Sequence, residues 1–274
     1  LQERSKLKIN YLLQFIPKKI VNKNSINPKT ICITGPANVG KSMITINLAK
    51  TFCFLKNKIA ILDFDIFYNS IQTILGLKNT SFSSENYFLK SKIKINKKMD
   101  LFIFKMQKEN NLIKNNYSKF TEEIKLSIKK EINNLQQYYD LILIDTNYQN
   151  LFKITNNIIL FSDFTIFISD TNLLEITKSI HLLDSYINSY QIPKNKFNIV
   201  FNKYNKNSIE INILKNIFSE FDVIGKLNYN EIYNTLINKN RKNTFQNKKL
   251  RKEYLEIIKK MDKKERRNEN GIRK

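Results

Sequence analysis

The stretch Thr30–Ser42, TICITGPANVGKS, restricts the possible folds of this chain more than any other part of it. It reads as an apolar run, Thr30–Thr34, then a loop bounded by two glycines, and then Lys41 and Ser42 at the start of a helical pattern. The spacing G-x-x-x-x-G-K-S between a strand and a helix is that of a phosphate-binding loop, or P-loop. The chain has only five glycines, and two of them stand at the positions that such a loop demands.

Each residue type in this loop suits contact with a triphosphate. Gly35 permits the turn off the strand, and successive backbone N–H groups at the positive end of the following helix can face phosphate oxygens. Lys41 neutralises the β- and γ-phosphates, and the Ser42 hydroxyl is placed to bind Mg²⁺. We therefore predict a triphosphate site whose contacts come from Gly35, Asn38, Val39, Gly40, Lys41, Ser42 and Met43.

Further buried strands follow, and several end in a polar side chain. Lys58–Phe64 leads into an Asp-x-Asp pair, Asp140–Asp145 ends in a carboxylate, and Phe197–Phe201 is followed by Asn202. We also expect strands at 100–106, 164–169 and 222–224, with helices between strands and an irregular segment at 78–99. This alternation predicts an α/β fold: a doubly wound, mostly parallel sheet of about seven to eight strands flanked by helices. The polar groups should then meet at the carboxyl edge of the sheet, where ligands bind.

These strand-end groups have the chemistry of a phosphoryl-transfer site. Asp145, after four apolar residues, is placed like a Walker B aspartate, which holds Mg²⁺ through water, and Asp65 can orient an attacking or Mg²⁺-bound water. Asp63 either braces the loop or caps a turn, and Asn202 either reads an adenine edge or is a turn residue. The predicted catalytic residues are Lys41 and Asp65, and the predicted metal residues are Ser42, Asp65 and Asp145.

The net charge of the chain is +23, from 47 Lys and Arg against 24 Asp and Glu. Such an excess favours contact with an anionic surface, either nucleic acid or acidic lipid. Lys, Asn and Ile are abundant throughout, so the charge equally fits the composition that a very AT-rich genome produces.

The cysteines and the hydropathy pattern indicate a cytoplasmic protein. Cys32 and Cys53 lie in apolar patterns without a C-x-x-C spacing, which is typical of buried thiols in a reducing compartment. No apolar run is long enough to span a bilayer, and no signal peptide is visible. We expect a cytoplasmic location. Peripheral contact with a membrane or with the nucleoid is compatible with it.

Three segments are expected along the chain. Residues 1–29 read as a leading helix and linker, and because the chain starts at Leu1 rather than Met we expect an upstream part. Residues 30–262 form the P-loop domain, and residues 263–274 form a basic, disordered tail. The last helix carries an apolar stripe with Leu250, Tyr254 and Ile258, which either packs on the sheet or lies on acidic lipid.

Together these motifs resemble the MinD/ParA family of P-loop ATPases (the SIMIBI class), from about Thr30 to Asn240. The resemblance is carried by GPANVGKSMITINLAKTF, IAILDFDIFYNSIQTILGL, YDLILIDT, IVFNKYN and VIGKLNYNEIYNTLINKN. It implies an ATP-dependent switch that positions an unidentified cargo protein, forms a face-to-face homodimer around ATP and Mg²⁺, and uses DNA or a membrane as its matrix. By matching position, Asp65 is the water-activating aspartate, Asp145 the Walker B residue and Asn202 the base contact.

Two stretches depart from the family pattern. Family members carry a second lysine early in the loop that reaches the partner's nucleotide, but Pro36 stands there, followed by Ala37 and Asn38 instead of glycines. The segment 146–150 lacks the usual Pro and Gly. Such divergent loops resemble the pilus-localising, CpaE/TadZ-like branch of the family. They predict slow hydrolysis, with nucleotide binding retained by Lys41 and Ser42.

Two other functions fit parts of the sequence. A degenerate, non-hydrolysing nucleotide-binding scaffold is favoured by the loop departures. A bacterial tyrosine kinase of the related P-loop type also has GKS followed by NLA, but such chains usually end in a tyrosine cluster, and here the tail offers only Tyr254.

Overall fold

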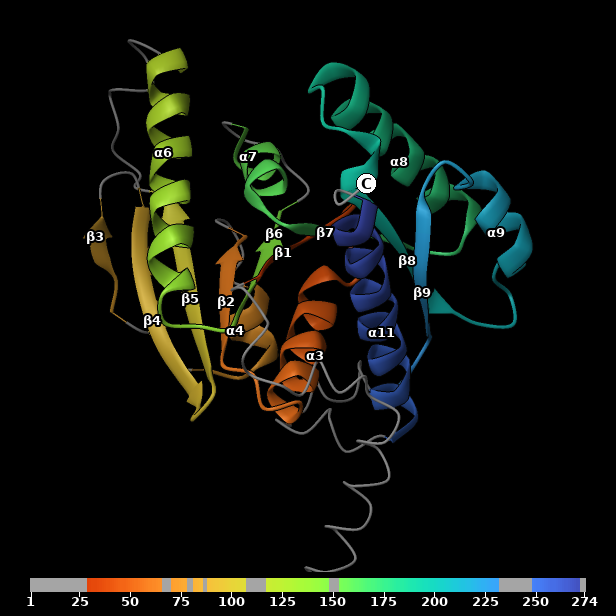
Figure 1. Ribbon diagram of the computed structural model, residues 1–274, viewed down its shortest axis with the longest axis horizontal. Helices are drawn as coiled ribbons and strands as arrows, with labels where there is room; N and C mark the ends of the chain where they lie inside the picture. The colour runs from red at the N-terminus through yellow and green to blue at the C-terminus, as the bar shows by residue number, and fades with distance from the viewer. Residues whose placement is uncertain are drawn as a thin grey trace, which may run out of the picture.

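The computed structural model describes residues 29–65, 70–77, 81–85, 88–106, 117–147, 153–231 and 248–271. Within these ranges one nine-stranded sheet has the order β3-β4-β5-β2-β6-β1-β7-β8-β9 (Figure 1). The strands are β1 (Lys29–Thr34), β2 (Ile59–Phe64), β3 (Ser83–Glu85), β4 (Phe88–Asn96), β5 (Met99–Met106), β6 (Leu141–Thr146), β7 (Phe164–Ser169), β8 (Phe197–Tyr204) and β9 (Asp222–Asn228). The α-helices are α3 (Lys41–Phe54), α4 (Ser70–Ile74), α6 (Tyr117–Gln136), α7 (Ile154–Phe161), α8 (Leu173–Asp184), α9 (Ile211–Ile217) and α11 (Lys248–Gly271), with a π-turn at Ser185–Ser189 and a 3₁₀ turn at Lys194–Lys196. The predicted leading helix lies in residues 1–28, outside the described residues.

Seven of the strands, from β5 to β9 in the sheet order, run parallel to their neighbours. The predicted doubly wound, mostly parallel sheet is confirmed. In the register of the central strands, Asp145 on β6 lies opposite both Asp63 on β2 and Ile33 on β1. The carboxyl end of β1, where the P-loop begins, therefore lies beside these carboxylates.

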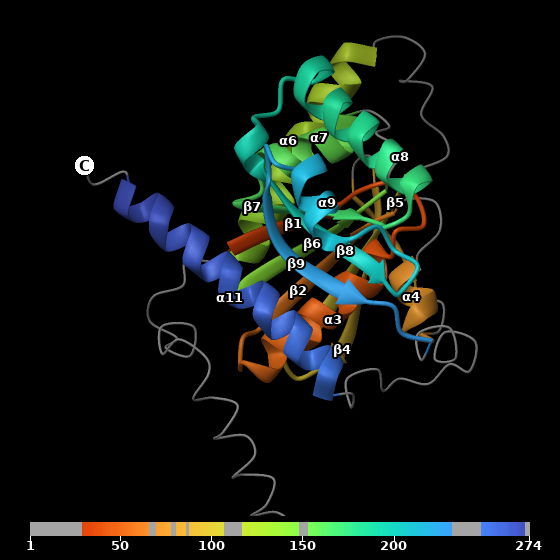
Figure 2. The ribbon, with the colours of Figure 1, turned by 90° about the vertical axis from the view of Figure 1, so that its right-hand side faces the viewer.

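Helices cover both faces of the sheet, because its central strands are apolar on both sides. Along β1, Ile31 and Ile33 pack into a cluster with α3, α4 and α11, whereas Cys32 packs into a second cluster with α6, α7, α8 and α9. Figure 2 shows α11 crossing the sheet on the side opposite α6, α7 and α8. Each central strand is fully buried, as the all-apolar runs predict.

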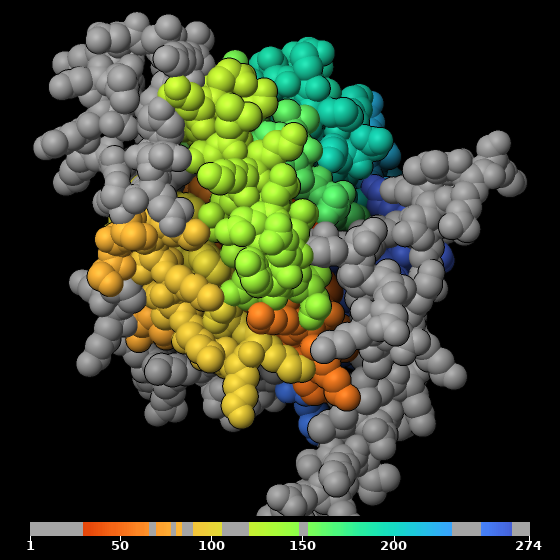
Figure 3. All heavy atoms as spheres, turned by 60° about the vertical axis from the view of Figure 1, so that its left-hand side comes forward, coloured from red at the N-terminus to blue at the C-terminus, as the bar shows by residue number. Residues whose placement is uncertain are grey.

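The prediction of an irregular segment at 78–99 was wrong, since it contains β3 and β4. Strand β4 pairs antiparallel with β5, so the sheet has nine strands rather than seven to eight. Ile93 and Ile95 pack toward the core, while Lys90 reaches Glu131 of α6 at 2.8 Å and lies over the ring of Phe102. Figure 3 shows the yellow hairpin and the yellow-green α6 side by side on one face. A lysine on this strand thus lies over apolar surface, so its position does not stand out in the sequence as half-buried.

The last helix packs on the sheet, which was one of the two positions that the sequence left open for it. Tyr254 and Ile258 of α11 are buried in the cluster with α3 and β9. The helix continues to Gly271, so the prediction of disorder from residue 263 was wrong over this part. At the beginning of this part, Lys264 fixes the helix to the sheet, because it binds Asp222 and Asn198 at the start of β9 and β8. Among the residues described here, no helix combines the length and apolar character that crossing a bilayer requires.

Candidate nucleotide site

The loop between β1 and α3 needs glycine at both predicted positions. Gly35 has φ +144°, and a Cβ there would lie 2.3 Å from the backbone oxygen of Ile168 on β7. Gly40 has φ +92°, and a Cβ there would lie 2.7 Å from Nδ2 of Asn202. Only glycine adopts such backbone angles without strain and leaves room for these neighbours. The loop is therefore pressed against both β7 and the end of β8.

Lys41, the predicted phosphate cation, folds back over the loop. Its Nζ donates to the carbonyl oxygens of Gly35 at 3.1 Å and Pro36 at 2.7 Å. Burial lowers the pKa of Lys41, and the negative charges of Asp145 and Asp65 oppose this shift. The ammonium thus lies against the first two residues of the loop and is attracted by the negative charges of Asp145 and Asp65.

The start of α3 supplies further donors. The first backbone bond of this helix runs from the N–H of Ile44 to the oxygen of Gly40 at 3.0 Å. The N–H groups of Lys41, Ser42 and Met43 precede it, so they lie outside the helical ladder. These are the groups that the sequence predicted for phosphate contact, together with those of Val39 and Asn38 in the loop.

Asp145 lies beneath the loop with one oxygen unpaired. The residue is 1% exposed, and its Oδ1 accepts from Thr45 Oγ1 at 3.3 Å. Its Oδ2 is buried and has no hydrogen-bond partner among the described residues. Burial raises the pKa of Asp145 to about 6, whereas the neighbouring Ser42 hydroxyl and the charge of Lys41 act in the opposite direction. A buried, partly satisfied carboxylate next to a serine hydroxyl fits a site for a hard cation.

The two carboxylates after β2 have different surroundings. Asp63 is fully buried and accepts from the N–H groups of Asp65 at 3.0 Å and Ile71 at 3.4 Å, so it caps the turn after the strand. Burial, and then the charge of Asp145, raises the pKa of Asp63 well above its ordinary value. Of the two roles left open for Asp63, turn capping is the one that its contacts support.

Asp65 is held by donors on both of its oxygens. Oδ1 accepts from Asn147 Nδ2 at 2.9 Å, and Oδ2 accepts from Ser70 Oγ at 2.8 Å. Asn147 follows β6 directly and was not predicted as a site residue. Its position two residues after Asp145 was the signal that could have revealed it. The catalytic role of Asp65 stays a prediction, but the structure brings it into the same site as Lys41 and Asp145.

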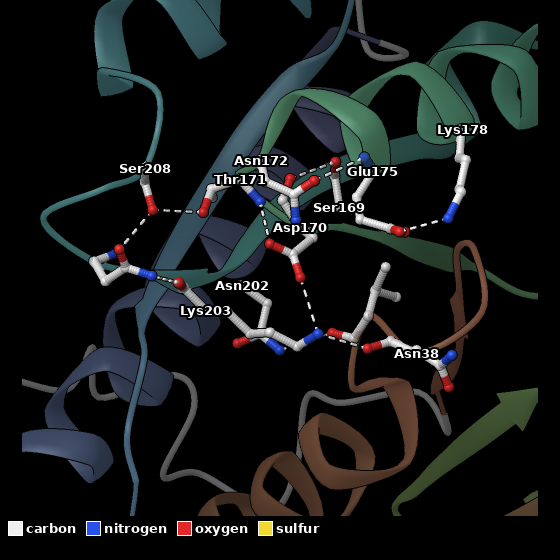
Figure 4. A network of polar contacts seen from close by, with 12 residues as sticks. Asn38, Ser169, Asp170, Thr171, Asn172, Glu175, Lys178, Asn202, Lys203 and Ser208 are labelled. Carbon is white, nitrogen blue, oxygen red and sulfur yellow. Dashed lines mark hydrogen bonds and ion pairs between the residues drawn. The ribbon is translucent and has the colours of Figure 1, made fainter.

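The end of β8 contacts the loop through two residues. Asn202 donates from Nδ2 to the oxygen of Val39 at 2.8 Å, and Lys203 donates from Nζ to the oxygen of Asn38 at 2.7 Å. Lys203 also pairs with Asp170, which follows β7 (Figure 4). Lys203 and Asp170 were missed by sequence reasoning, although both lie directly at strand ends. Base contact by Asn202 stays a prediction.

Comparisons with known proteins agree with this geometry. Residues 25–146 match the family model ParA, described as NUBPL iron-transfer P-loop NTPase. An iron–sulfur cluster carrier protein of Methanocaldococcus jannaschii is 37% identical over 59 residues, which are 22% of this chain and 20% of that protein. The chain thus matches about a fifth of the length of this relative.

Two solved structures share the fold over most of the chain. A plasmid partition protein of Borrelia burgdorferi bound to AMPPNP has a TM-score of 0.62 at 23% identity, covering 86% of this chain and 99% of that one. The septum site-determining protein MinD of Pyrococcus horikoshii, complexed with Mg-ADP, has a TM-score of 0.61 at 14% identity, covering 86% and 96%.

The parallel sheet, the glycine-bounded loop and the carboxylates at the strand ends define a P-loop NTPase. Within that class, residues 25–146 are similar to the ParA family, and the fold is the one that the plasmid partition protein and MinD share.

Proposed function

We propose that this chain is an ATP-binding positioning switch that hydrolyses ATP slowly. The observation that carries the proposal is the buried, unpaired Oδ2 of Asp145, which lies in one site with Ser42, Lys41 and Asp65. An arrangement of one cation, one hydroxyl and two carboxylates has the parts that phosphoryl transfer requires, since this chemistry depends on positioning and charge neutralisation.

The donor set suits Mg²⁺ with a bound nucleotide. No group of three His, Cys, Asp or Glu that could hold a metal alone exists among the described residues. Mg²⁺ in nucleotide sites typically takes one or two protein ligands, and phosphate oxygens and water complete its shell. The Ser42 hydroxyl would bind the ion directly, while Asp145 and Asp65 would hold it through water. When bound, the ion would neutralise charge on the phosphates.

The residues of the chain would divide the remaining work. Lys41 would exchange the carbonyls of Gly35 and Pro36 for phosphate oxygens, at a cost of two hydrogen bonds. Asp65, fixed by Asn147 and Ser70, would orient the attacking water. Slow turnover follows from Pro36, which has no side-chain cation to add.

The same proposal includes three kinds of partner: a second copy of the chain in the nucleotide-bound state, a cargo protein, and an anionic surface. Five lysines support the last of these: Lys97 and Lys98 between β4 and β5, Lys94 near the end of β4, and two more between α3 and β2. The two segments lie side by side, because Lys98 accepts at its backbone oxygen from Ile59 N–H at 2.7 Å and donates from Nζ to Lys56 O at 3.1 Å. Within the described part of the chain no ion pair joins any of the five to an acidic side chain. This hairpin lysine cluster consists of Lys56, Lys58, Lys94, Lys97 and Lys98.

An iron–sulfur carrier function, which the names of one relative and of the family model suggest, has less support. The chain has two cysteines. Cys32 and Cys53 pack into the clusters on opposite faces of the sheet, so one chain cannot offer both thiols to one cluster. Burial also raises the pKa of the Cys53 thiol to about 11, which disfavours the thiolate that binds iron.

The test measures binding, turnover and assembly on the full chain. Calorimetric titration with Mg²⁺ and a non-hydrolysable ATP analogue should show binding, phosphate release should be slow, and light scattering should show a dimer only with the analogue. Binding without phosphate release would favour the scaffold, and phosphotyrosine formation would favour the kinase. Absence of binding would refute the proposal.

A further inference from the structure

The phosphate loop is held from outside by two consecutive residues at the end of β8. Asn202 engages the carbonyl of Val39 at 2.8 Å, and Lys203 engages the carbonyl of Asn38 at 2.7 Å. Figure 4 shows the Lys203 side chain lying between Asn38 of the loop and Asp170. Two neighbouring peptide units of the loop are thereby each fixed by one side-chain donor.

The planarity of the peptide unit turns these contacts into an orientation of the opposite groups. In a trans peptide the C=O and the following N–H point in opposite directions. A carbonyl of Asn38 that faces Lys203 therefore turns the N–H of Val39 away from Lys203, toward the interior of the loop. The bond from Asn202 acts in the same way on the N–H of Gly40. Both N–H groups belong to the predicted phosphate contacts.

This loop has a particular need for such support. Asn38 has φ 60°, a left-handed conformation in a residue that carries a side chain. Asparagine tolerates this conformation better than most residues but less well than glycine. Ala37 and Asn38 stand where the family usually has glycines. The conformation of the loop is therefore stabilised less by intrinsic backbone preference and more by contacts with other residues.

Lys203 is itself held in place. Its Nζ lies 2.9 Å from Oδ2 of Asp170, whose side chain is 9% exposed, and Oδ1 of Asp170 accepts from the N–H of Thr171 at 2.6 Å. Lys203 also has a positive φ of 59°, so the backbone turns at this residue. The ammonium is thus fixed between the largely buried carboxylate of Asp170, just after β7, and the loop carbonyl of Asn38.

We propose that Lys203, anchored by Asp170, is a positioning residue that sets the phosphate loop in its phosphate-binding conformation. It acts through the N–H of Val39 and does not touch the nucleotide. The inference rests on the proposed function, because it concerns how the same loop receives phosphate. The end of β8 thus stabilises a loop conformation that the loop's own residue types favour only weakly.

The test compares variants of the full chain in binding an ATP analogue and inorganic tripolyphosphate, each with Mg²⁺. Lys203→Met keeps most of the side-chain volume but removes the charged donor, and we expect it to weaken both ligands about tenfold. Lys203→Arg keeps a charged donor and should restore most of the affinity. A role in packing alone would give the reverse order, with Met tolerated and Arg not.

Two further variants make the result decisive. Lys194→Met removes an exposed ion pair with Glu220, remote from the loop, and should leave both affinities unchanged. Asp170→Asn removes the anchor of Lys203 and should weaken binding in the same direction, which preserves the test if Lys203→Met does not fold. Unchanged affinity in both Lys203→Met and Asp170→Asn would overturn the inference alone. If the unaltered chain binds neither ligand, the proposed function falls as well.

Discussion

Thr45 of α3 donates from its hydroxyl to Oδ1 of Asp145 at 3.3 Å, while Oδ2 of the same carboxylate is buried without a hydrogen-bond partner among the described residues. A buried carboxylate with an unpaired oxygen costs free energy in a protein that holds no cation. The site is thus less stable by itself than a neutral site would be. The same oxygen is available to a hydrated metal ion.

The first prediction concerns Asp145→Asn in protein free of metal and nucleotide. Because burial raises the folded-state pKa of Asp145 from 3.8 to about 6, the folded state binds more protons than the unfolded state in this range. The contribution of this group to stability therefore falls as pH rises from about 4 to about 6. The substitution should raise the free energy of unfolding by about 2–3 kcal/mol at pH 7 and by little near pH 4. Urea unfolding of both proteins across this range tests the prediction, and an equal effect at both ends would contradict it.

Asn147 is predicted to act on turnover rather than on binding. Asn147→Ala removes the 2.9 Å bond to Oδ1 of Asp65 and leaves the bond from Ser70. The carboxylate should then sample more orientations, and kcat should fall about tenfold with little change in nucleotide affinity. Single-turnover phosphate release and calorimetric titration separate the two effects. A loss of affinity without a loss of rate would argue against this role.

Gly35→Ala is predicted to damage both stability and binding. The new Cβ would meet the backbone oxygen of Ile168 at 2.3 Å, and this oxygen belongs to a central strand that cannot move freely. We expect destabilisation by about 2–3 kcal/mol together with weaker nucleotide binding. Ala37→Gly in the same loop is the control, and it should cost at most about 1 kcal/mol. Thermal unfolding provides the comparison, and equal melting temperatures for the two variants would be inconsistent with the tight contact at Gly35.

The hairpin lysine cluster is predicted to take part in binding an anionic surface. Replacement of Lys94 and Lys97 by Gln should lower the slope of log affinity against log salt by about two for DNA, if DNA is the partner. The control variant replaces the exposed Lys130 and Lys215, which lie on α6 and α9, by Gln. Cosedimentation with DNA and with acidic vesicles distinguishes the two surfaces. Identical salt slopes for the two double variants would exclude a specific part for this cluster.

Local sequence patterns predicted the central sheet and the loop correctly, and the reason is physical. An all-apolar strand is fully buried only when helices cover both faces of its sheet. The polar residue that follows such a strand must then lie at the edge of the sheet where the strand ends. This logic placed Lys41, Asp65 and Asp145 in one site. It failed for β4, where Lys90, Lys92 and Lys94 occupy every second position and the ammonium groups of the first two lie over the ring of Phe102, so that a half-buried strand looked like a polar loop.

The contacts that hold the site could not be predicted in the same way. Lys203 and Asn38 are 165 residues apart in the sequence, and Asn147 and Asp65 are 82 apart. Each pair meets only because of the strand order, which places β6 next to β2 and leaves β8 one strand away from β1. A single sequence gives no information on such pairings, even when both residues stand at recognisable strand ends.

The central claim, that Lys41 is the cation of a triphosphate site, is tested most directly by the Mg²⁺-dependent affinity of Lys41→Ala for a non-hydrolysable ATP analogue. The account predicts a loss of about a hundredfold or more, since a charged donor to phosphate is removed from a buried site. Lys215→Ala on the exposed face of α9 should bind as tightly as the unaltered chain. Equal affinity of Lys41→Ala and the unaltered chain would contradict the account.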